Sequence, residues 1–198
     1  MDAKGQENKV KLWTRQDSRS LKQLKETGRI RITEGHLREK FENISDYILE
    51  LYRWFNLKAD KIVRKPEGVE FPIWCSISEK NMLRPTKNTV VYVLEVDRSK
   101  IIYFDGSKWD YVLNHLYLPK DKEDEERYNK KLKEAGFKHG FSFIDKKTSH
   151  FYPERKKEVM ESWNRVFEID EWNIFKVQAN IWEIKEDMVR DIIHYTGE

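Results

Sequence analysis

Apolar and polar residues alternate along several short segments of the chain, and alternation at period two predicts strands with one buried face. Other short segments are continuously apolar and β-branched, which also favours strands. The predicted strands are VKLWTRQ (10–16), RIRI (29–32), FPIWCSIS (71–78), TVVYVLEV (89–96), KIIYFD (100–105), GFSFID (140–145), FKVQANIWEI (175–184) and IIHYT (192–196). The fourth and fifth are expected at the centre of a sheet, and Pro72 places the third at an edge or at a strand start.

Apolar residues at steps of three and four predict the helices. The longest predicted helix runs from Leu37 to about Phe55, and its buried face carries Leu37, Phe41, Ile44, Ile48, Leu51 and Phe55. A short helix with Leu21 and Leu24 is expected between a cap at Asp17 or Ser18 and a stop at Gly28.

Three further helices are expected in the second half of the chain. One lies in SKWDYVLNHLYLP and is stopped by Pro119, and a mixed-charge helix in KDKEDEERYNKKLKEAGF ends at Gly136. The third begins near Pro153 and places Val159, Trp163, Val166 and Phe167 on one face.

Length and composition predict a single folded α+β domain. The 198 residues are 38% hydrophobic and 13% aromatic, with seven Trp, and contain no repeat, linker or low-complexity block. We therefore expect a flexible N-terminus over residues 1–9 and one α+β domain over 10–198, with a central mixed or antiparallel sheet and flanking helices.

Charge and cysteine content indicate which partners and which cellular compartment to expect. The net charge of +3, from 38 basic and 35 acidic residues, does not require a nucleic-acid partner. Cys75 is the single cysteine and lies in an apolar stretch, so a buried, inert thiol and a reducing compartment are expected. No signal peptide and no apolar run of about 18 residues is present. We expect a cytoplasmic protein without a membrane partner.

Several kinds of chemistry lack a motif in this sequence. The five histidines, His36, His115, His139, His150 and His194, are scattered, so no metal site is expected. The chain has no GxGxxG, Walker or GxSxG motif. No spacing supports Cys75 paired with a histidine as a nucleophile.

Polar and aromatic side chains on the predicted strands form the candidate binding site. In the strand at 175–184, Val177, Ala179 and Ile181 would face the core, which leaves Gln178, Asn180 and Trp182 on the other face. Such groups suit a planar, polar ligand such as a nucleotide. The alternative is that the Trp residues fill a core and a few reach its rim. The candidate binding residues are Trp13, Thr14, Arg15, Gln16, Trp74, Ser76, Asp105, Trp109, Gln178 and Trp182.

Four segments resemble an uncharacterised bacterial domain family of unknown function, over nearly the whole chain. The most specific parts are LWT-x-Q at the start, P-I-W in the middle, W-x-YVLN-x-x-YLP, and Q-A-x-x-W-E near the end. The order of elements is also distantly similar to ADP-ribosyltransferases of the DNA-modifying DarT type. The similar features are an x-T first strand, a helix ending in Gly, a strand opened by Pro and followed by Met-Leu, and an apolar strand ending in Val-Asp.

The second resemblance implies an ADP-ribosyltransferase-like fold with NAD as substrate. Gln178 falls where those enzymes carry the catalytic Glu, and it is followed by Met188, Val189, Ile192 and Ile193. Trp13 and Thr14 would line the NAD pocket in place of a His, Trp74 would support its wall, and Met82 and Leu83 would belong to the next element. Because Gln178 brings no negative charge, Glu168, Glu171 or Glu183 would have to supply it. Glu183 is expected on the opposite face of the strand from Gln178.

The expected function is therefore an NAD-consuming, ADP-ribosyltransferase-like enzyme that binds NAD or a related nucleotide. The acceptor of ADP-ribose would be a nucleic acid or a protein. The basic stretches KADKIVRK and KKLKEAGFKHG would suit phosphate-bearing targets or serve only solubility. Two alternatives stay open. One is a non-catalytic nucleotide-sensing or protein-interaction module on the same fold, and the other is a toxin-like component with a cognate inhibitor protein.

Overall fold

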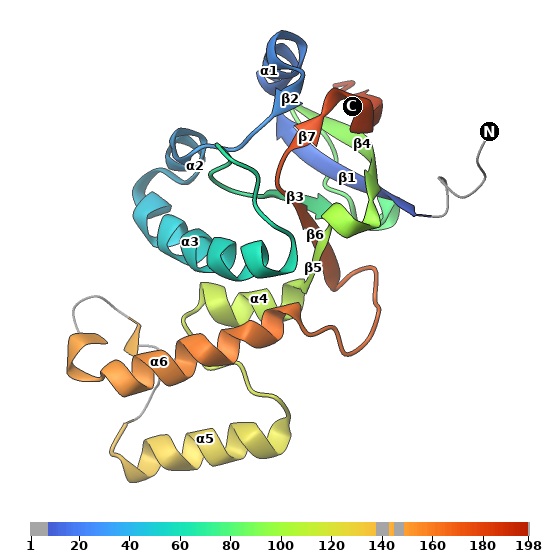
Figure 1. The fold of residues 1–198 in the computed structure, drawn as a ribbon. Coiled ribbons are helices and arrows are strands. Elements are labelled where there is room, and N and C mark those ends of the chain that lie inside the picture. The colour runs from blue at the N-terminus through green and yellow to red at the C-terminus, as the bar shows by residue number, and fades with distance from the viewer. Residues whose placement is uncertain (1–7, 138–142, 145–148, 198) are drawn as a thin grey trace. The chain divides into compact units, whose positions relative to one another are not determined.

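The computed structural model describes residues 8–137, 143–144 and 149–197 (Figure 1). Most of the predicted flexible N-terminus and most of the predicted strand GFSFID lie outside these residues. The chain divides into two compact units, which are described separately. The sheet unit comprises Met1–Tyr103 and Trp172–Glu198, and the helical unit comprises Phe104–Glu171.

Eight strands and six α-helices are present in the described residues. The strands are β1 (Lys9–Asp17), β2 (Arg29–Ile30), β3 (Ile73–Ser76), β4 (Thr89–Asp97), β5 (Ile102–Asp105), β6 (Val177–Ile181), β7 (Ile184–Lys185) and β8 (Val189–His194). The helices are α1 (Ser20–Thr27), α2 (Glu34–Phe41), α3 (Ser45–Ile62), α4 (Gly106–Leu113), α5 (Lys122–Glu134) and α6 (Pro153–Ser162).

Six of the strands form one sheet in the order β5-β6-β3-β1-β4-β8, and β2 pairs with β7 in a second, two-stranded sheet. The pairings of β1 with β3 and β4, of β3 with β6, and of β4 with β8 are antiparallel. This confirms an α+β protein with an antiparallel sheet. Figure 1 shows β1 running between β3 and β4.

The expected strand order was wrong in one respect, because β3 and β1 occupy the centre. Of the two most apolar strands, β4 is second from one edge, beside β8, and β5 forms the other edge. Apolar composition reports how deeply the side chains of a strand are buried and does not report its place in the hydrogen-bonded order. Ile102 and Phe104 are fully buried although β5 is an edge strand.

The first strand and the helix after it form as the pattern predicts. β1 pairs with β4 along its whole length, from Lys9 opposite Asp97 to Asp17 opposite Thr89. Helix α1 ends at Gly28, whose φ of 69° is left-handed. The expected side-chain cap at Asp17 or Ser18 is absent, because the N-cap residue is Arg19. The Asp17 carboxylate instead accepts a hydrogen bond from the backbone N–H of Arg19.

The predicted long helix from Leu37 to Phe55 is two helices. Helix α2 ends at Phe41, a 3-10 turn follows, and α3 starts at Ser45. Glu42 interrupts the helix because its φ is 43°, outside helical geometry. The turn also changes which residues face inward, so that Ile44, expected in the core, is 56% exposed, whereas Leu49 is fully buried.

The helical unit follows its predicted pattern with one change of boundary. Helix α4 ends at Leu113, well before Pro119. Helix α5 is followed by Gly136 with φ 80°, and α6 begins at Pro153, as predicted. On the face of α6 and the 3-10 turn after it, Val159, Trp163 and Val166 are buried and Phe167 is half-buried.

The predicted strand at 175–184 is shorter than expected, and its second face is not open. Val177, Ala179 and Ile181 are buried, as predicted. Asn180 and Trp182, expected to face a ligand, are buried too. The indole N–H of Trp182 donates to the backbone oxygen of Val63, 2.7 Å away, because the chain leaving α3 covers this face. Gln178 alone of the three remains partly exposed.

The two glycines Gly28 and Gly35 provide a matched test of the backbone. Gly28→Ala should lower the free energy of unfolding by about 1 kcal/mol, because φ +69° forces a Cβ into the left-handed region. Gly35→Ala, inside α2 with its nearest neighbour 3.6 Å from the added Cβ, should raise it by up to about 1 kcal/mol. Urea denaturation measures both. Equal effects of the two substitutions would contradict the left-handed assignment of Gly28.

Candidate functional site

Strands β1 and β3 pair at a single position, Trp13 opposite Ser76. Past this position a side chain joins them: the Thr14 hydroxyl donates to the backbone oxygen of Trp74, 2.8 Å away. The Gln16 amide in turn donates to the Thr14 hydroxyl at 2.7 Å. The two central strands therefore separate toward the C-terminal end of β1, and polar side chains lie where ladder hydrogen bonds would otherwise be.

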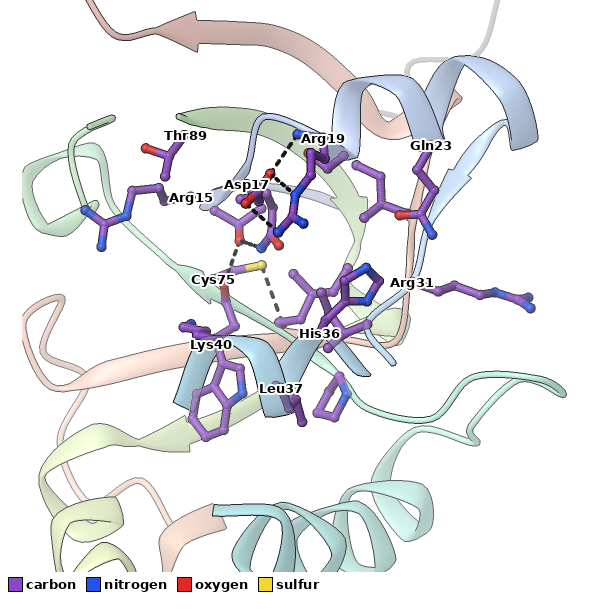
Figure 2. A pocket seen from close by; sticks show the side chains of 18 of the residues that line it. Arg15, Asp17, Arg19, Gln23, Arg31, His36, Leu37, Lys40, Cys75 and Thr89 are labelled. Carbon is purple, nitrogen blue, oxygen red and sulfur yellow. Dashed lines mark hydrogen bonds and ion pairs between the residues drawn. The ribbon is translucent and has the colours of Figure 1, made fainter. Parts of the chain in front are cut away.

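A cavity of about 890 Å³ lies at this separation (Figure 2). Its walls come mainly from β1, α1, α2 and β3, with further residues from β2, α3, β4, β6 and the segments after β2 and β3, all within the sheet unit. Seven residues predicted for the site line it, namely Trp13, Thr14, Arg15, Gln16, Trp74, Ser76 and Gln178. The structure thus brings together residues from three strands that are far apart in sequence.

Three predicted site residues lie elsewhere. Asp105 caps helix α4 by accepting hydrogen bonds from two backbone N–H groups, and Trp109 is buried in the same unit. Trp182 is buried against the chain that follows α3 and is not among the residues that line the cavity.

Helices α1 and α2 contribute lining residues that sequence reasoning missed. Arg19, Lys22 and Gln23 come from the start of α1, and His36, Glu39 and Lys40 come from α2. Asp17 and Arg19 come just after the predicted strand at 10–16, which carries site residues, so their place in the sequence could have predicted them as lining residues. Nothing in the sequence places α2 at the cavity, because its position depends on contacts between distant elements.

A three-membered ion pair fixes one wall of the cavity. The Arg19 guanidinium forms two hydrogen bonds of 2.9 Å with the Asp17 carboxylate and a third contact of 2.9 Å with Glu39. The hydrogen bond from Arg19 lowers the pKa of Asp17, and the two carboxylates raise the pKa of Arg19. Asp17 and Arg19 therefore stay charged at neutral pH, and Arg19 joins β1 to α2 through its contact with Glu39.

Glu183 is one of the three carboxylates expected to supply the missing negative charge, and its surroundings disfavour that role. It is 7% exposed, and its carboxylate lies 2.8 Å from Arg31, 3.7 Å from Arg29 and 3.5 Å from Lys185. Three cations thus compensate one carboxylate, which is not among the cavity-lining residues. Glu168 and Glu171, the other two candidates, belong to the helical unit.

Gln178 reaches the cavity from β6, opposite Ser76 in the strand register. Its side chain makes no hydrogen bond with any residue that the structure describes, whereas Ser76 donates to the backbone oxygen of Asn81 at 3.0 Å. A partly exposed amide has two donors and an acceptor to offer a ligand. Gln178 is therefore suited to contact a polar group.

Cys75 is not a nucleophile in this structure. Its side chain is buried, as predicted, and burial raises the pKa of its thiol to about 12. A thiol with that pKa is almost entirely protonated at neutral pH, and the thiolate is the reactive form. In the described part of the chain, no group of three or more His, Cys, Asp or Glu side chains is arranged to hold a metal ion.

Comparison with known proteins identifies the family. A family model described as a domain of unknown function (DUF3841) matches residues 11–190, so the chain belongs to the DUF3841 family. Neither the curated proteins nor the solved structures contain a match to the chain. Among the residues described, no helix is both long and apolar enough to cross a membrane.

The buried thiol gives a chemical test of the site. Cys75 should react with a disulfide reagent at pH 8 at least about 100-fold more slowly in the native protein than in the protein unfolded by guanidinium, because folding raises its pKa from 9.0 to about 12. The unfolded state loses its proton first, so the free energy of unfolding should fall as pH rises above about 9. Reaction of the native thiol at the unfolded rate would show that Cys75 is accessible and reactive.

Proposed function

We propose that this protein is an ADP-ribosyltransferase-like domain that binds NAD or a related nucleotide and transfers ADP-ribose to a nucleic acid or a protein. The observation that carries the proposal is the cavity at the separation of β1 and β3, which Gln178 enters from β6. The distant resemblance of the element order to DarT-type enzymes puts NAD-binding residues on the same strands.

The size and lining of the cavity support a nucleotide as the ligand. Sites for small molecules and cofactors occupy about 300–1,000 Å³, and the cavity of about 890 Å³ falls in this range. Trp13, Tyr52 and Trp74 supply aromatic surface for a planar ring. Gln178, which is partly exposed, supplies neutral hydrogen-bonding groups for ribose hydroxyls.

The proposed transfer breaks the bond between the ribose C1′ and nicotinamide. The bonding electrons leave with nicotinamide, and an acceptor oxygen or nitrogen forms the new bond to C1′ while its proton passes to water. The transition state carries positive charge on the ribose, which nearby negative groups stabilise. Gln178 can orient a ribose hydroxyl, and the carboxylates of Asp17, Glu26 and Glu39 lie in the cavity wall.

A second candidate is a nucleotide-sensing module without turnover. Every Asp and Glu that lines the cavity is in an ion pair with a cation: Asp17 and Glu39 with Arg19, and Glu26 with Lys22. The residue at the catalytic position of the resembling enzymes is neutral Gln178. Both observations favour binding of the ligand over stabilisation of a cationic transition state.

Nicotinamide release during incubation with NAD, followed in parallel with calorimetric binding, separates the two candidates. The transferase proposal predicts release above background by the wild type and its loss in Gln178→Ala, since the amide that orients the ribose is removed. Gln178→Glu restores a carboxylate of nearly the same shape and should raise the rate of release by about 10-fold or more.

Asn164→Ala, which removes an exposed amide in the helical unit, is the matched control and should leave binding and release unchanged. Thermal unfolding confirms that each variant is folded. Binding of NAD without release would favour the sensing module. A folded wild-type protein that neither binds nor consumes NAD would overturn both candidates.

A further inference from the structure

Basic residues outnumber acidic residues in the lining of the cavity. Five of the lining residues are Lys or Arg, and three are Asp or Glu. Three of the five cations have a carboxylate partner: Arg19 pairs with Asp17 and Glu39, Lys22 with Glu26, and Arg31 with Glu183. The pairing leaves two cations, one on β1 and one on α2.

These two cations are Arg15 and Lys40, and neither has a carboxylate oxygen within 4.0 Å among the described residues. Arg15 donates one N–H to the backbone oxygen of Arg84 at 3.1 Å, which leaves most of its five N–H groups for another acceptor. The Lys40 ammonium lies 5.2 Å from the centre of the Phe41 ring and has no oxygen acceptor in the described residues.

The positive charge of Arg15 acts on the Lys40 ammonium. Figure 2 shows Arg15 and Lys40 on the left of the cavity, away from the Asp17–Arg19 pair. The pKa of Lys40 is lowered, first by desolvation of its ammonium group among the surrounding residues and second by the positive charge of Arg15. Both side chains are exposed to solvent, where two like charges repel each other only weakly in the empty protein. An anion bound between them would remove that repulsion.

We propose that Arg15 and Lys40 form the subsite for the diphosphate of a nucleotide. This inference rests on the proposed function, because it assigns one part of the same ligand. The planar Arg fork pairs with two phosphate oxygens at once, and Lys adds a compact second charge. Aromatic Trp13 and Trp74 line the same cavity, so a base or nicotinamide and the diphosphate can be bound together.

Calorimetry with NAD, ADP, adenosine and inorganic pyrophosphate tests the subsite. Arg15→Gln and Lys40→Gln should each weaken binding of NAD, ADP and pyrophosphate by at least about 10-fold, since each variant loses a charge-assisted contact to phosphate. Binding of adenosine, which has no phosphate, should change by less than about twofold. Arg15→Lys keeps the charge and should retain more affinity than Arg15→Gln.

Lys25→Gln is the matched control, because it removes one charge from an exposed position on α1 that does not line the cavity. Its affinities should equal those of the wild type. Thermal unfolding of all four variants checks that they fold.

The outcomes distinguish this inference from the proposed function. If Arg15→Gln and Lys40→Gln both bind NAD with wild-type affinity, the subsite is overturned and the proposed function stands. Pyrophosphate bound by the wild type and lost in the variants, with no binding of NAD, would support the subsite and overturn the function. If Arg15→Gln and Lys40→Gln lose binding to a single-stranded oligonucleotide but bind ADP as the wild type does, the two cations contact the phosphates of a nucleic acid. That result would overturn the inference. No binding of NAD, ADP or pyrophosphate would overturn both proposals.

Discussion

The separation of β1 from β3 is the constraint on which the rest of the sheet unit depends. A buried backbone oxygen without a partner costs about 1–3 kcal/mol, so strands inside a sheet can separate only where another donor replaces the ladder. Thr14 provides that donor to the oxygen of Trp74, and Gln16 then donates to the Thr14 hydroxyl. The polar residues on this face of β1 are therefore part of the fold, and they also line the cavity that the separation opens.

The charged residues around the cavity show how much of its chemistry is structural. Arg19 joins β1 to α2 through Asp17 and Glu39, and Glu183 holds Arg31 and Arg29 beside the two-stranded sheet. The charge of Glu183, which is 7% exposed, is tolerated because cations surround it, whereas the Arg19 pairs are exposed to solvent. Arg15 and Lys40 differ from the other cavity cations, because neither has a carboxylate partner in the part of the chain that the structure describes.

The sequence predicts the strands and the helix stops more reliably than the site. Alternation shows β1 and β6, and Gly28 and Gly136 mark helix ends, because these signals are local. The break at Glu42 was missed because a non-glycine residue adopts a positive φ there, which composition does not indicate. The burial of Trp182 depends on a segment 119 residues away in sequence, the chain after α3, and Asn180 donates to the backbone oxygen of Ile73, 107 residues away. Lining residues from α2 were missed for the same reason.

Under the proposed function, the remaining question about chemistry is which group would supply negative charge to the ribose of the nucleotide. Gln178 is well placed but neutral, and the lowered pKa of Asp17 keeps that carboxylate ionised through the neutral range. The Arg19 guanidinium that positions Asp17 also offsets the negative charge of Asp17. The carboxylate therefore stabilises a nearby positive charge less than an unpaired carboxylate would. A phosphate bound at Arg15 and Lys40, as proposed, would leave the Asp17–Arg19 pair intact, so this wall would supply little net negative charge to the ribose.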